Sequence, residues 1–470
     1  MTGNLATAGI SSVTAGTSNF VAGVNAGNSI VSGGNYNTLV GDEAGTAVTT
    51  GAENTAVGKG ALQNNTTGGD NVAVGLNALV SQTTGSSSVA IGKESLQNNT
   101  TGGSNVAIGK DTLKGNTTGS DNTAVGKDSL RSNTTANNNT AVGGAALQAN
   151  TTGTENTSVG SVSLDANTTG DRNTAVGHES LGSNTTADNN TGVGYGALNA
   201  NTTGANNTAV GSGALEINTT GAYNSAFGHH TLDANTTGSY NTATGRASLG
   251  YNTTGQFNSA AGYVSLLNNT TGQKNTGSGA YSGANLSTGI ENTFIGYNAG
   301  GTRTTGSNNV CIGYNSGHDG TTSSDLLFIA RNNTGPSNAA TWIFGDSAGA
   351  CRQGNNATTW TQTSDERIKK NIVDSPNGLA KIDALQVRNF NYRTEEEITV
   401  EGLTGCDATG LQVGVIAQEI EAVLPEAVTE SDSGQKQVQT DPIFWSMVKA
   451  IQELSAQNAA LEARLTALEE

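Results

Sequence analysis

A repeat of 17 residues occupies more than half of this chain and leaves few possible folds. The motif Asn-Thr-Ala-Val-Gly, seen in this form at residues 54–58, recurs in 17 copies spaced by 17 residues, with no insertion or deletion. One copy begins with Ser88 in place of Asn, and the register continues through it. The first positions are residues 37, 54, 71, 88, 105, 122, 139, 156, 173, 190, 207, 224, 241, 258, 275, 292 and 309. Such a period indicates a stacked architecture with one structural unit per repeat.

Each unit contains two apolar positions and a cluster of turn-forming residues. The fourth position is apolar, as at Val57 and Ile91, and the ninth is Leu in thirteen successive copies from Leu62 to Leu266. Between the ninth position and the next motif lies Asn-Thr-Thr-Gly, as at residues 65–68, which favours a turn. We predict a short strand, a turn, a second short strand and another turn in every unit.

One unit is too small to fold alone. Two or three inward apolar side chains offset only part of the ordering entropy of 17 residues, at roughly 1–2 kcal/mol each. Stacked as rungs of a parallel β-solenoid or β-roll, the 16 steps of about 4.8 Å would make a rod of roughly 75–80 Å. The fold class is therefore expected to be mostly β, with ladders of identical Asn and Thr side chains along the rod.

The repeat resembles the head repeats of trimeric autotransporter adhesins, with their Asn-x-Ala-x-Gly strands, and similar arrays in phage tail fibres. The resemblance covers residues 37–317. It implies a left-handed parallel β-roll with three chains side by side. A single-chain solenoid has the same period and remains an alternative.

Other features of the repeat have simple explanations. We attribute the Asn-Thr-Thr triplets to turn chemistry instead of glycosylation, and we expect no metal or cofactor, because the four histidines fall at unrelated repeat positions: His178, His229, His230 and His318. Aromatic residues crowd the second half of the array and could form a glycan-binding face, although larger core or flanking residues are the favoured explanation. They are Tyr195, Tyr223, Phe227, Tyr240, Tyr251, Phe257, Tyr263, Tyr281, Phe294, Tyr297 and Tyr314.

Charge divides the chain near residue 364. About 26% of residues 364–470 are charged (28 of 107), against about 9% of the preceding part (31 of 363), which indicates two different domains. We expect residues 1–36 to start the shaft and residues 318–363 to form a transition or knob, with strands at Leu326–Ala330 and Trp342–Phe344.

The overall charge restricts the classes of binding partner that we expect, and the cysteines indicate the cellular compartment of assembly. The net charge of −17 disfavours nucleic acid and anionic membranes. Cys311, Cys351 and Cys406 form no CxxC pair, which fits assembly in a reducing cytosol. No basic leader and no apolar run of 18 residues occurs, so we expect neither Sec export nor membrane insertion.

The C-terminal part carries the most specific motifs. It contains Ser364-Asp365-Glu366-Arg367-Ile368-Lys369-Lys370-Asn371-Ile372, then Phe390-Asn391-Tyr392, Val413-Gly414-Val415-Ile416-Ala417-Gln418-Glu419-Ile420, Leu424-Pro425-Glu426 and Ala450-Ile451-Gln452-Glu453-Leu454. In order and spacing these resemble the intramolecular chaperone domain of endosialidases, phage fibres and some eukaryotic membrane-bound transcription factors. The resemblance covers nearly all of residues 364–470 and implies an α+β chaperone domain that ends in a trimeric coiled coil.

This resemblance implies self-cleavage after the fibre has folded and trimerised. On the matching positions the scissile bond is Thr363–Ser364, Ser364 is the nucleophile and Lys369 the general base. A hydroxyl nucleophile needs a neighbouring base, and a lysine can serve only when burial keeps it neutral. Alternatively, Ser364 is simply the N-cap of a helix. The implied activity is that of a single-turnover serine peptidase, and we expect no other.

The chain ends in a predicted coiled coil at about residues 443–470. Spacings of four and three alternate through Met447, Ile451, Leu454, Asn458, Leu461, Leu465 and Leu468, which is a heptad seam with one polar position. A coiled coil would align three chains of a repeat that could otherwise pair out of register by whole rungs.

Together these features predict a homotrimeric phage tail fibre or spike, assembled in the host cytoplasm and carried on the virion tail. Its mature part, residues 1–363, is expected to contact a bacterial surface glycan or receptor. The alternatives are a structural or adhesive filament that uses the same chaperone without receptor binding, and a depolymerase, which the acid-poor repeats disfavour. A trimeric autotransporter lacks support, because neither a signal peptide nor a C-terminal barrel is evident.

Overall fold

The computed structural model describes two compact units, Met1–Trp360 and Thr361–Glu470. The described residues are 10–11, 15–317, 322–331, 341–345, 347, 351–353, 372–393, 397–398, 410–430 and 434–469. The first unit holds one 22-stranded sheet, and the second holds three α-helices and two small sheets.

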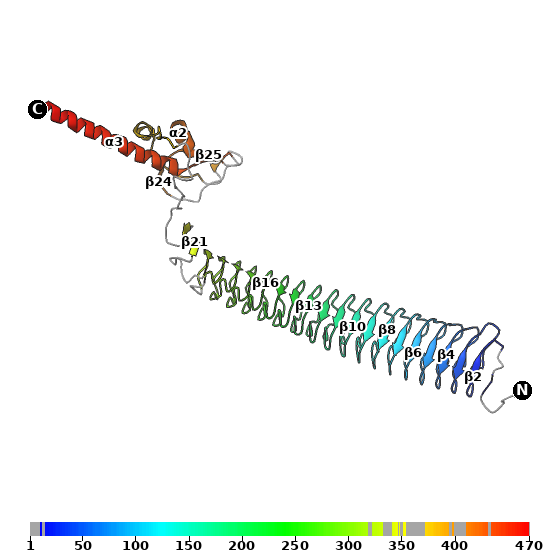
Figure 1. Ribbon diagram of the computed structural model, residues 1–470. Coiled ribbons are helices and arrows are strands. Elements are labelled where there is room, and N and C mark those ends of the chain that lie inside the picture. Colours follow the sequence, from blue (N-terminus) through cyan, green and yellow to red (C-terminus); the bar gives the residue numbers. More distant parts are fainter. Residues whose placement is uncertain are drawn as a thin grey trace. The chain divides into compact units, whose positions relative to one another are not determined.

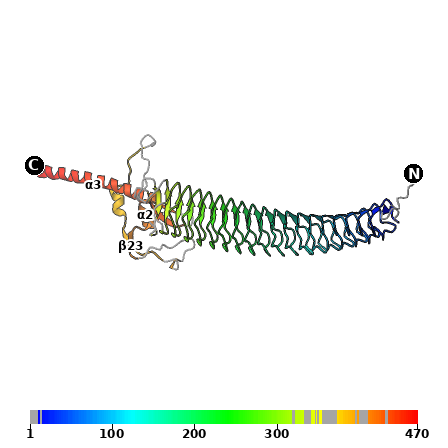
Figure 2. The same ribbon diagram turned by 90° about the horizontal axis from the view of Figure 1, so that it is seen from below.

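The first unit is a parallel β-solenoid, as the repeat predicts. Strand β1 (Ile10–Ser11) pairs antiparallel with β2, and from β2 to β20 each strand pairs in parallel with the next, at equivalent repeat positions (Figures 1 and 2). The strands are β2 Phe20–Ala22, β3 Thr38–Val40, β4 Thr55–Val57, β5 Val72–Val74, β6 Val89–Ile91, β7 Val106–Ile108, β8 Thr123–Val125, β9 Thr140–Val142, β10 Thr157–Val159, β11 Thr174–Val176, β12 Thr191–Val193, β13 Thr208–Val210, β14 Ser225–Phe227, β15 Thr242–Thr244, β16 Ser259–Ala261, β17 Thr276–Ser278, β18 Thr293–Ile295, β19 Val310–Ile312 and β20 Leu327–Ala330.

Each rung contains one strand, so the predicted second strand is wrong. After the strand the backbone enters the left-handed region repeatedly, with φ of 133° at Gly58, 55° at Leu62 and 59° at Asp70. A strand cannot continue through such residues. The turns still bond to the next rung, because the Leu62 N–H donates to Ala78 O at 2.9 Å and the Thr66 N–H to Thr83 O at 2.8 Å.

The interior is thin, and its apolar side chains come from the third and ninth repeat positions, with the small residue at the eighth position, such as Ala61, buried beside them. The third position, Ala56 in the first complete motif, and the ninth, Leu62, are fully buried. The fourth position points outward, and Val57 is 37% exposed, so the expectation that this apolar residue faces inward is wrong. Neighbouring strand residues point to opposite faces, and the small Ala occupies the inner one.

Towards the ends of the shaft, large and small residues exchange places. Leu39 occupies the third position and Gly45 the ninth, whereas Phe294 is accompanied by Gly283 and Gly300. A Cβ on Gly300 would lie 2.4 Å from the Phe294 ring. The interior volume is thus conserved while the residues that fill it change.

Ladders of Asn and Thr run along the shaft, as expected. The buried Asn116 side chain donates from Nδ2 to Asn99 Oδ1 at 2.7 Å and to Gly119 O at 2.9 Å. Thr100 Oγ1 donates to Thr117 O in the next rung at 3.0 Å. A second Asn ladder precedes the strands, where the Asn139 N–H donates to Asn122 Oδ1 at 3.0 Å.

Both strands predicted after the repeats are present. β20 continues the parallel stack, and β21 (Thr341–Gly345) and β22 (Cys351–Gln353) add antiparallel strands. The Phe328 and Phe344 ring centroids lie 5.0 Å apart. Cys311 in β19 is buried.

The second unit is α+β, as expected. Its elements are α1 Leu379–Ala384, β23 Arg388–Phe390, β24 Gln412–Gly414, α2 Ala417–Val423, the 3-10 helix η3 Pro425–Ala427, β25 Val428–Glu430, β26 Lys436–Val438 and α3 Thr440–Glu469. β23 pairs antiparallel with β24, and β25 with β26. Within the described residues, no helix combines the length and apolar character that crossing a membrane requires.

Candidate functional site

The predicted cleavage site, Thr363, Ser364 and Lys369, lies outside the described residues. Its chemistry therefore stays a prediction. The described residues of this unit start at Ile372 and include the helices and strands that follow the cleavage motif.

A small core organises the second unit. Three residues are buried in this core: Ile420 of α2, Leu424 between α2 and η3, and Ala427 of η3. The core residues packed against them at its edge are Leu385, Val415, Val428, Val438 and Ile443. This core joins α2, the β25–β26 hairpin and the first turn of α3, so the long helix starts from a folded base.

Polar contacts attach α1 to the same base. Glu453 of α3 accepts a hydrogen bond from the Leu379 N–H at 2.8 Å, and Lys381 Nζ donates to Val423 O at 2.6 Å. Gly378 permits this approach, because a Cβ there would lie 2.3 Å from Glu453 Oε1. The acceptor at the start of α1 satisfies an N–H that the helix itself leaves unpaired.

Two of the surface ion pairs of this unit involve α2. Arg388 Nη2 is 2.8 Å from Glu419 Oε1, and Lys436 pairs with Glu421. The hydrogen bond from Arg388 lowers the pKa of the Glu419 carboxyl below its ordinary value. Exposed pairs of this kind contribute little to stability, but they connect β23 and β26 to α2.

The heptad seam on α3 is uncovered in the single chain. Its apolar members Met447, Ile451, Leu454, Leu461, Leu465 and Leu468 are 46–83% exposed, and Asn458 is exposed among them. The residues of α3 that are buried are Ser446 and Ala450, near its start. A continuous apolar stripe on a solvated helix indicates an interaction surface.

A second uncovered apolar stripe follows the outer face of the shaft's sheet. The fourth repeat position forms a ladder on this face, and many of its members are 36–43% exposed: Val57, Ile91, Ile108, Val142, Val159, Val176, Val210, Phe227 and Ile295. We call this set the outer ladder. It runs from β4 to β14 and returns at β18, because the fourth positions of β15, β16 and β17 are Thr244, Ala261 and Ser278.

The aromatic residues form ladders on the outside of the shaft. Of the eleven named above, Phe294 is buried and the others are at least 36% exposed, so the core explanation holds for Phe294 and the rest flank the rungs. Tyr223, Tyr240 and Phe257 stack with ring centroids 5.0 Å apart and nearly parallel planes. Both faces of the Tyr240 ring are therefore occupied by protein.

A second aromatic run follows it along the shaft. Tyr263, Tyr281 and Tyr297 meet edge to face, with centroids 5.3 and 5.7 Å apart, and Tyr297 stacks on Tyr314 at 5.4 Å. Arg246 lies over the Tyr263 ring at 5.7 Å. Edge-to-face contacts leave more ring face uncovered than stacking does.

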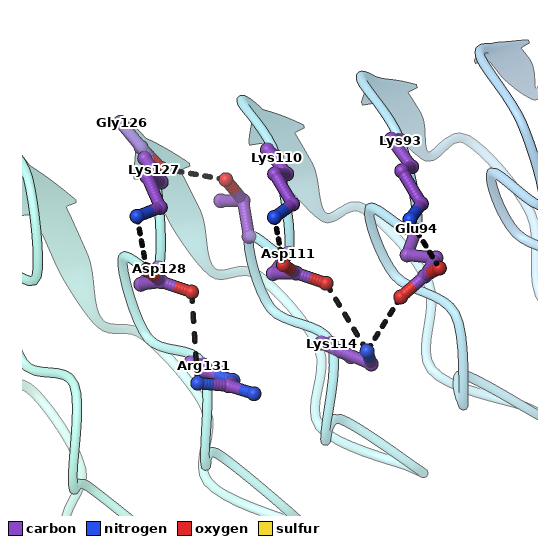
Figure 3. A network of polar contacts seen from close by, with 10 residues as sticks. Lys93, Glu94, Lys110, Asp111, Lys114, Gly126, Lys127, Asp128 and Arg131 are labelled. Carbon is purple, nitrogen blue, oxygen red and sulfur yellow. Dashed lines mark hydrogen bonds and ion pairs between the residues drawn. The ribbon is translucent and has the colours of Figure 1, made fainter.

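Charged side chains form a network over the rungs at residues 93–131 (Figure 3). Lys114 Nζ bridges Glu94 Oε2 at 2.6 Å and Asp111 Oδ1 at 3.1 Å. Hydrogen bonds from Lys114 and Lys93 lower the pKa of Glu94. Burial opposes ionisation of Asp111, but its bond to Lys114 brings its net pKa below the usual value.

The histidines are surface residues, except that His318 lies outside the described residues. His178 stacks on Tyr195 at 5.7 Å, and His229 meets His230 edge to face at 4.0 Å. His230 also belongs to a cluster with Glu216 and Asp233, which is absent from the sequence predictions. Glu216 and Asp233 are 17 residues apart, so the period itself places them on neighbouring rungs.

Comparison with known protein families identifies the C-terminal domain. Residues 364–429 match the family model described as Chaperone of endosialidase. No solved structure matches the chain. The matched segment starts at Ser364 and ends in β25, before α3. A solenoid shaft followed by this domain fits a tail-fibre-like protein with an intramolecular chaperone.

Proposed function

We propose that the chain assembles into a homotrimeric phage tail fibre or spike, and that residues 364–470 direct the assembly. The observation that carries this proposal is the uncovered heptad seam on α3, which follows directly after the chaperone match. Six apolar side chains facing water along one helix are stabilised when a second and a third copy cover them. The occupant of the seam is therefore another copy of the same helix.

The outer ladder supports the same assembly along the shaft. Val57, Ile91 and their equivalents form an apolar stripe on a sheet face that no other described element of the first unit covers. Three shafts placed with these faces together would remove the stripe from water. The rungs from β4 to β14 present nearly the same stripe, so shafts could also pair displaced by whole rungs. A coiled coil that aligns the chains first would prevent this.

Autoproteolysis between Thr363 and Ser364 then releases the chaperone. The Ser364 hydroxyl attacks the carbonyl carbon of Thr363 while Lys369 accepts its proton. The C–N bond between Thr363 and Ser364 breaks, the Ser364 nitrogen takes up that proton as an amine, and water hydrolyses the resulting ester to a Thr363 carboxylate and the Ser364 hydroxyl. Removal of the aligning domain leaves the assembled shaft kinetically trapped. The mature fibre, residues 1–363, contacts the bacterial surface on the virion tail.

The test is denaturing mass spectrometry of the purified chain beside Ser364→Ala and Lys369→Ala, with Lys370→Ala as the matched control. We expect fragments 1–363 and 364–470 from the native chain and from Lys370→Ala, and intact chains from the other two. An intact native chain under conditions where trimers form would remove the peptidase and leave residues 364–470 as a permanent trimerisation cap.

A structural filament without receptor binding is the second candidate. The observation in its favour is the stacking of Tyr223, Tyr240 and Phe257, since sugars bind aromatic rings through the faces that this stack covers. Adsorption of the mature trimer to host cells decides between the two candidates. Saturable adsorption supports a receptor-binding fibre, and its absence on every strain that the phage infects supports the filament.

A further inference from the structure

Glu216, His230 and Asp233 bring two carboxylates and an imidazole together on neighbouring rungs. Glu216 and Asp233 occupy the tenth repeat position of successive rungs, and His230 occupies the seventh position of the second rung. One ligand atom from each lies within 4.8 Å of the others. His230 Nδ1 and Asp233 Oδ2 are 3.1 Å apart.

The same two columns hold a different charge pattern in the rungs of Figure 3. There the seventh position supplies Glu94 and Asp111, and Lys114 at the tenth position bridges them. At Glu216 and Asp233 the acids occupy the tenth position, and the residue between them is His230. A neutral imidazole does not offset two stacked carboxylates as a lysine does, so the cluster lacks a permanent cation.

His230 Nδ1 is shielded from solvent and has no hydrogen-bond partner, although the Asp233 carboxylate is close. When an imidazole nitrogen lies beside a carboxylate and forms no hydrogen bond with it, a metal ion that binds both the nitrogen and a carboxylate oxygen can satisfy the nitrogen. This second observation concerns the imidazole and is independent of the acidic pair.

Gly213 leaves space at this point. It occupies the seventh position directly before His230 in the column, and its φ is 65°. A Cβ at Gly213 would lie 2.6 Å from His230 Nδ1 and 3.1 Å from Glu216 Oε2. A side chain here would enter the volume between these two ligand atoms, so the glycine keeps that volume open.

We propose that Glu216, His230 and Asp233 bind one divalent transition-metal ion of the zinc class per chain. Imidazole with carboxylates suits Zn²⁺, whereas Mg²⁺ and Ca²⁺ prefer sites made wholly of oxygen. Tetrahedral zinc places its ligand atoms about 3.3 Å apart, so these part-exposed side chains need only small rotations. Water fills the fourth position, and the ion ties two rungs of the shaft together.

The test is isothermal titration of the metal-free full chain with ZnCl₂ near neutral pH. We expect one ion per chain, at least tenfold weaker binding by His230→Gln and unchanged binding by His178→Gln. His178 is the matched control because it is also a surface histidine of the shaft, with one carboxylate, Glu179, at 3.8 Å. CaCl₂ should bind at least tenfold more weakly than ZnCl₂.

Gly213→Asn should block the site, and Asn can adopt the positive φ that the backbone has at this position. Asn77, Asn298 and Asn315 adopt positive φ at the same repeat position, so this variant should keep the shaft folded and lose zinc binding. The proposal is overturned if the native chain does not bind zinc saturably, if His230→Gln or Gly213→Asn binds like the native chain, or if calcium binds equally well. None of these results depends on cleavage or trimerisation.

Discussion

Adjacent residues of the same type have opposite environments in this shaft. Asn98 is exposed, whereas Asn99 is buried and its side chain makes three hydrogen bonds, to Gln82, Gly102 and Asn116. The position of a residue within the 17-residue unit therefore predicts its environment better than its residue type does. At this scale the buried amide ladder is the main polar determinant of the fold, because each amide satisfies groups that water cannot reach.

Asn99→Ala should destabilise the shaft by about 2–4 kcal/mol, because it leaves the Gln82 and Gly102 oxygens without a donor and removes one of the two acceptors of the Asn116 amide. The measurement is the denaturant midpoint together with hydrogen exchange of the neighbouring rungs. Asn98→Ala is the control and should leave both nearly unchanged. Equal effects of the two substitutions would contradict the ladder as a source of stability.

Lys114→Met should lower the unfolding midpoint slightly at pH 7 and have no effect near pH 2. Glu94 and Asp111 have lowered pKa values in the folded chain, so their contribution is present above the unfolded pKa, about 4, and is lost as pH falls through the folded values. Thermal unfolding across this range checks it. Lys59→Met, whose pair with Asp42 spans 3.6 Å between exposed groups, should have a smaller effect.

At the scale of elements, the shaft strands are short and the C-terminal helix is long, for different reasons. The strands of most rungs have three residues, because glycine with positive φ follows directly, as Gly126 follows β8. Helix α3 continues for 30 residues without Gly and with one Pro, Pro442, in its first turn, where proline is tolerated. Its last turns make no part of the unit's core, so a partner is needed to cover them.

The seam on α3 should control assembly. Leu461→Asp with Leu465→Asp would bury two carboxylates in a trimer interface, so we expect monomers in sedimentation velocity. Ala456→Asp with Ala463→Asp adds the same charge outside the seam and should leave trimers intact. Trimers of the double variant would show that the outer ladder alone suffices for assembly.

At the scale of the whole molecule, the constant period links the shaft to the chaperone. No rung in residues 37–317 has an insertion, so every buried column continues without a break. Because of the same regularity, chains that pair displaced by whole rungs lose little binding free energy. A separate aligning domain can prevent this error.

Deletion of residues 139–155 removes one complete rung and should yield a shaft that folds, because Asn138 then precedes Asn156 in the same register. Deletion of residues 139–154 leaves one extra residue and displaces every column at that point, which exposes buried groups. Proteinase K digestion followed by mass spectrometry checks this. We expect cleavage at the junction of the second variant, and equal resistance of both would contradict a strict register.

The stacked β fold, the Asn and Thr ladders and the amphipathic C-terminal helix could be predicted from the sequence, because each depends on spacing along the chain. Which side chains of each strand point into the core could not be predicted in this way. A three-residue strand such as Thr55–Val57 can place either its ends or its centre inside, and the pattern favoured Val57. Packing reversed this, because Leu62 already fills most of the thin interior and leaves room only for small residues such as Ala56. The cluster at His230 likewise depends on stacking, since it joins residues of two rungs.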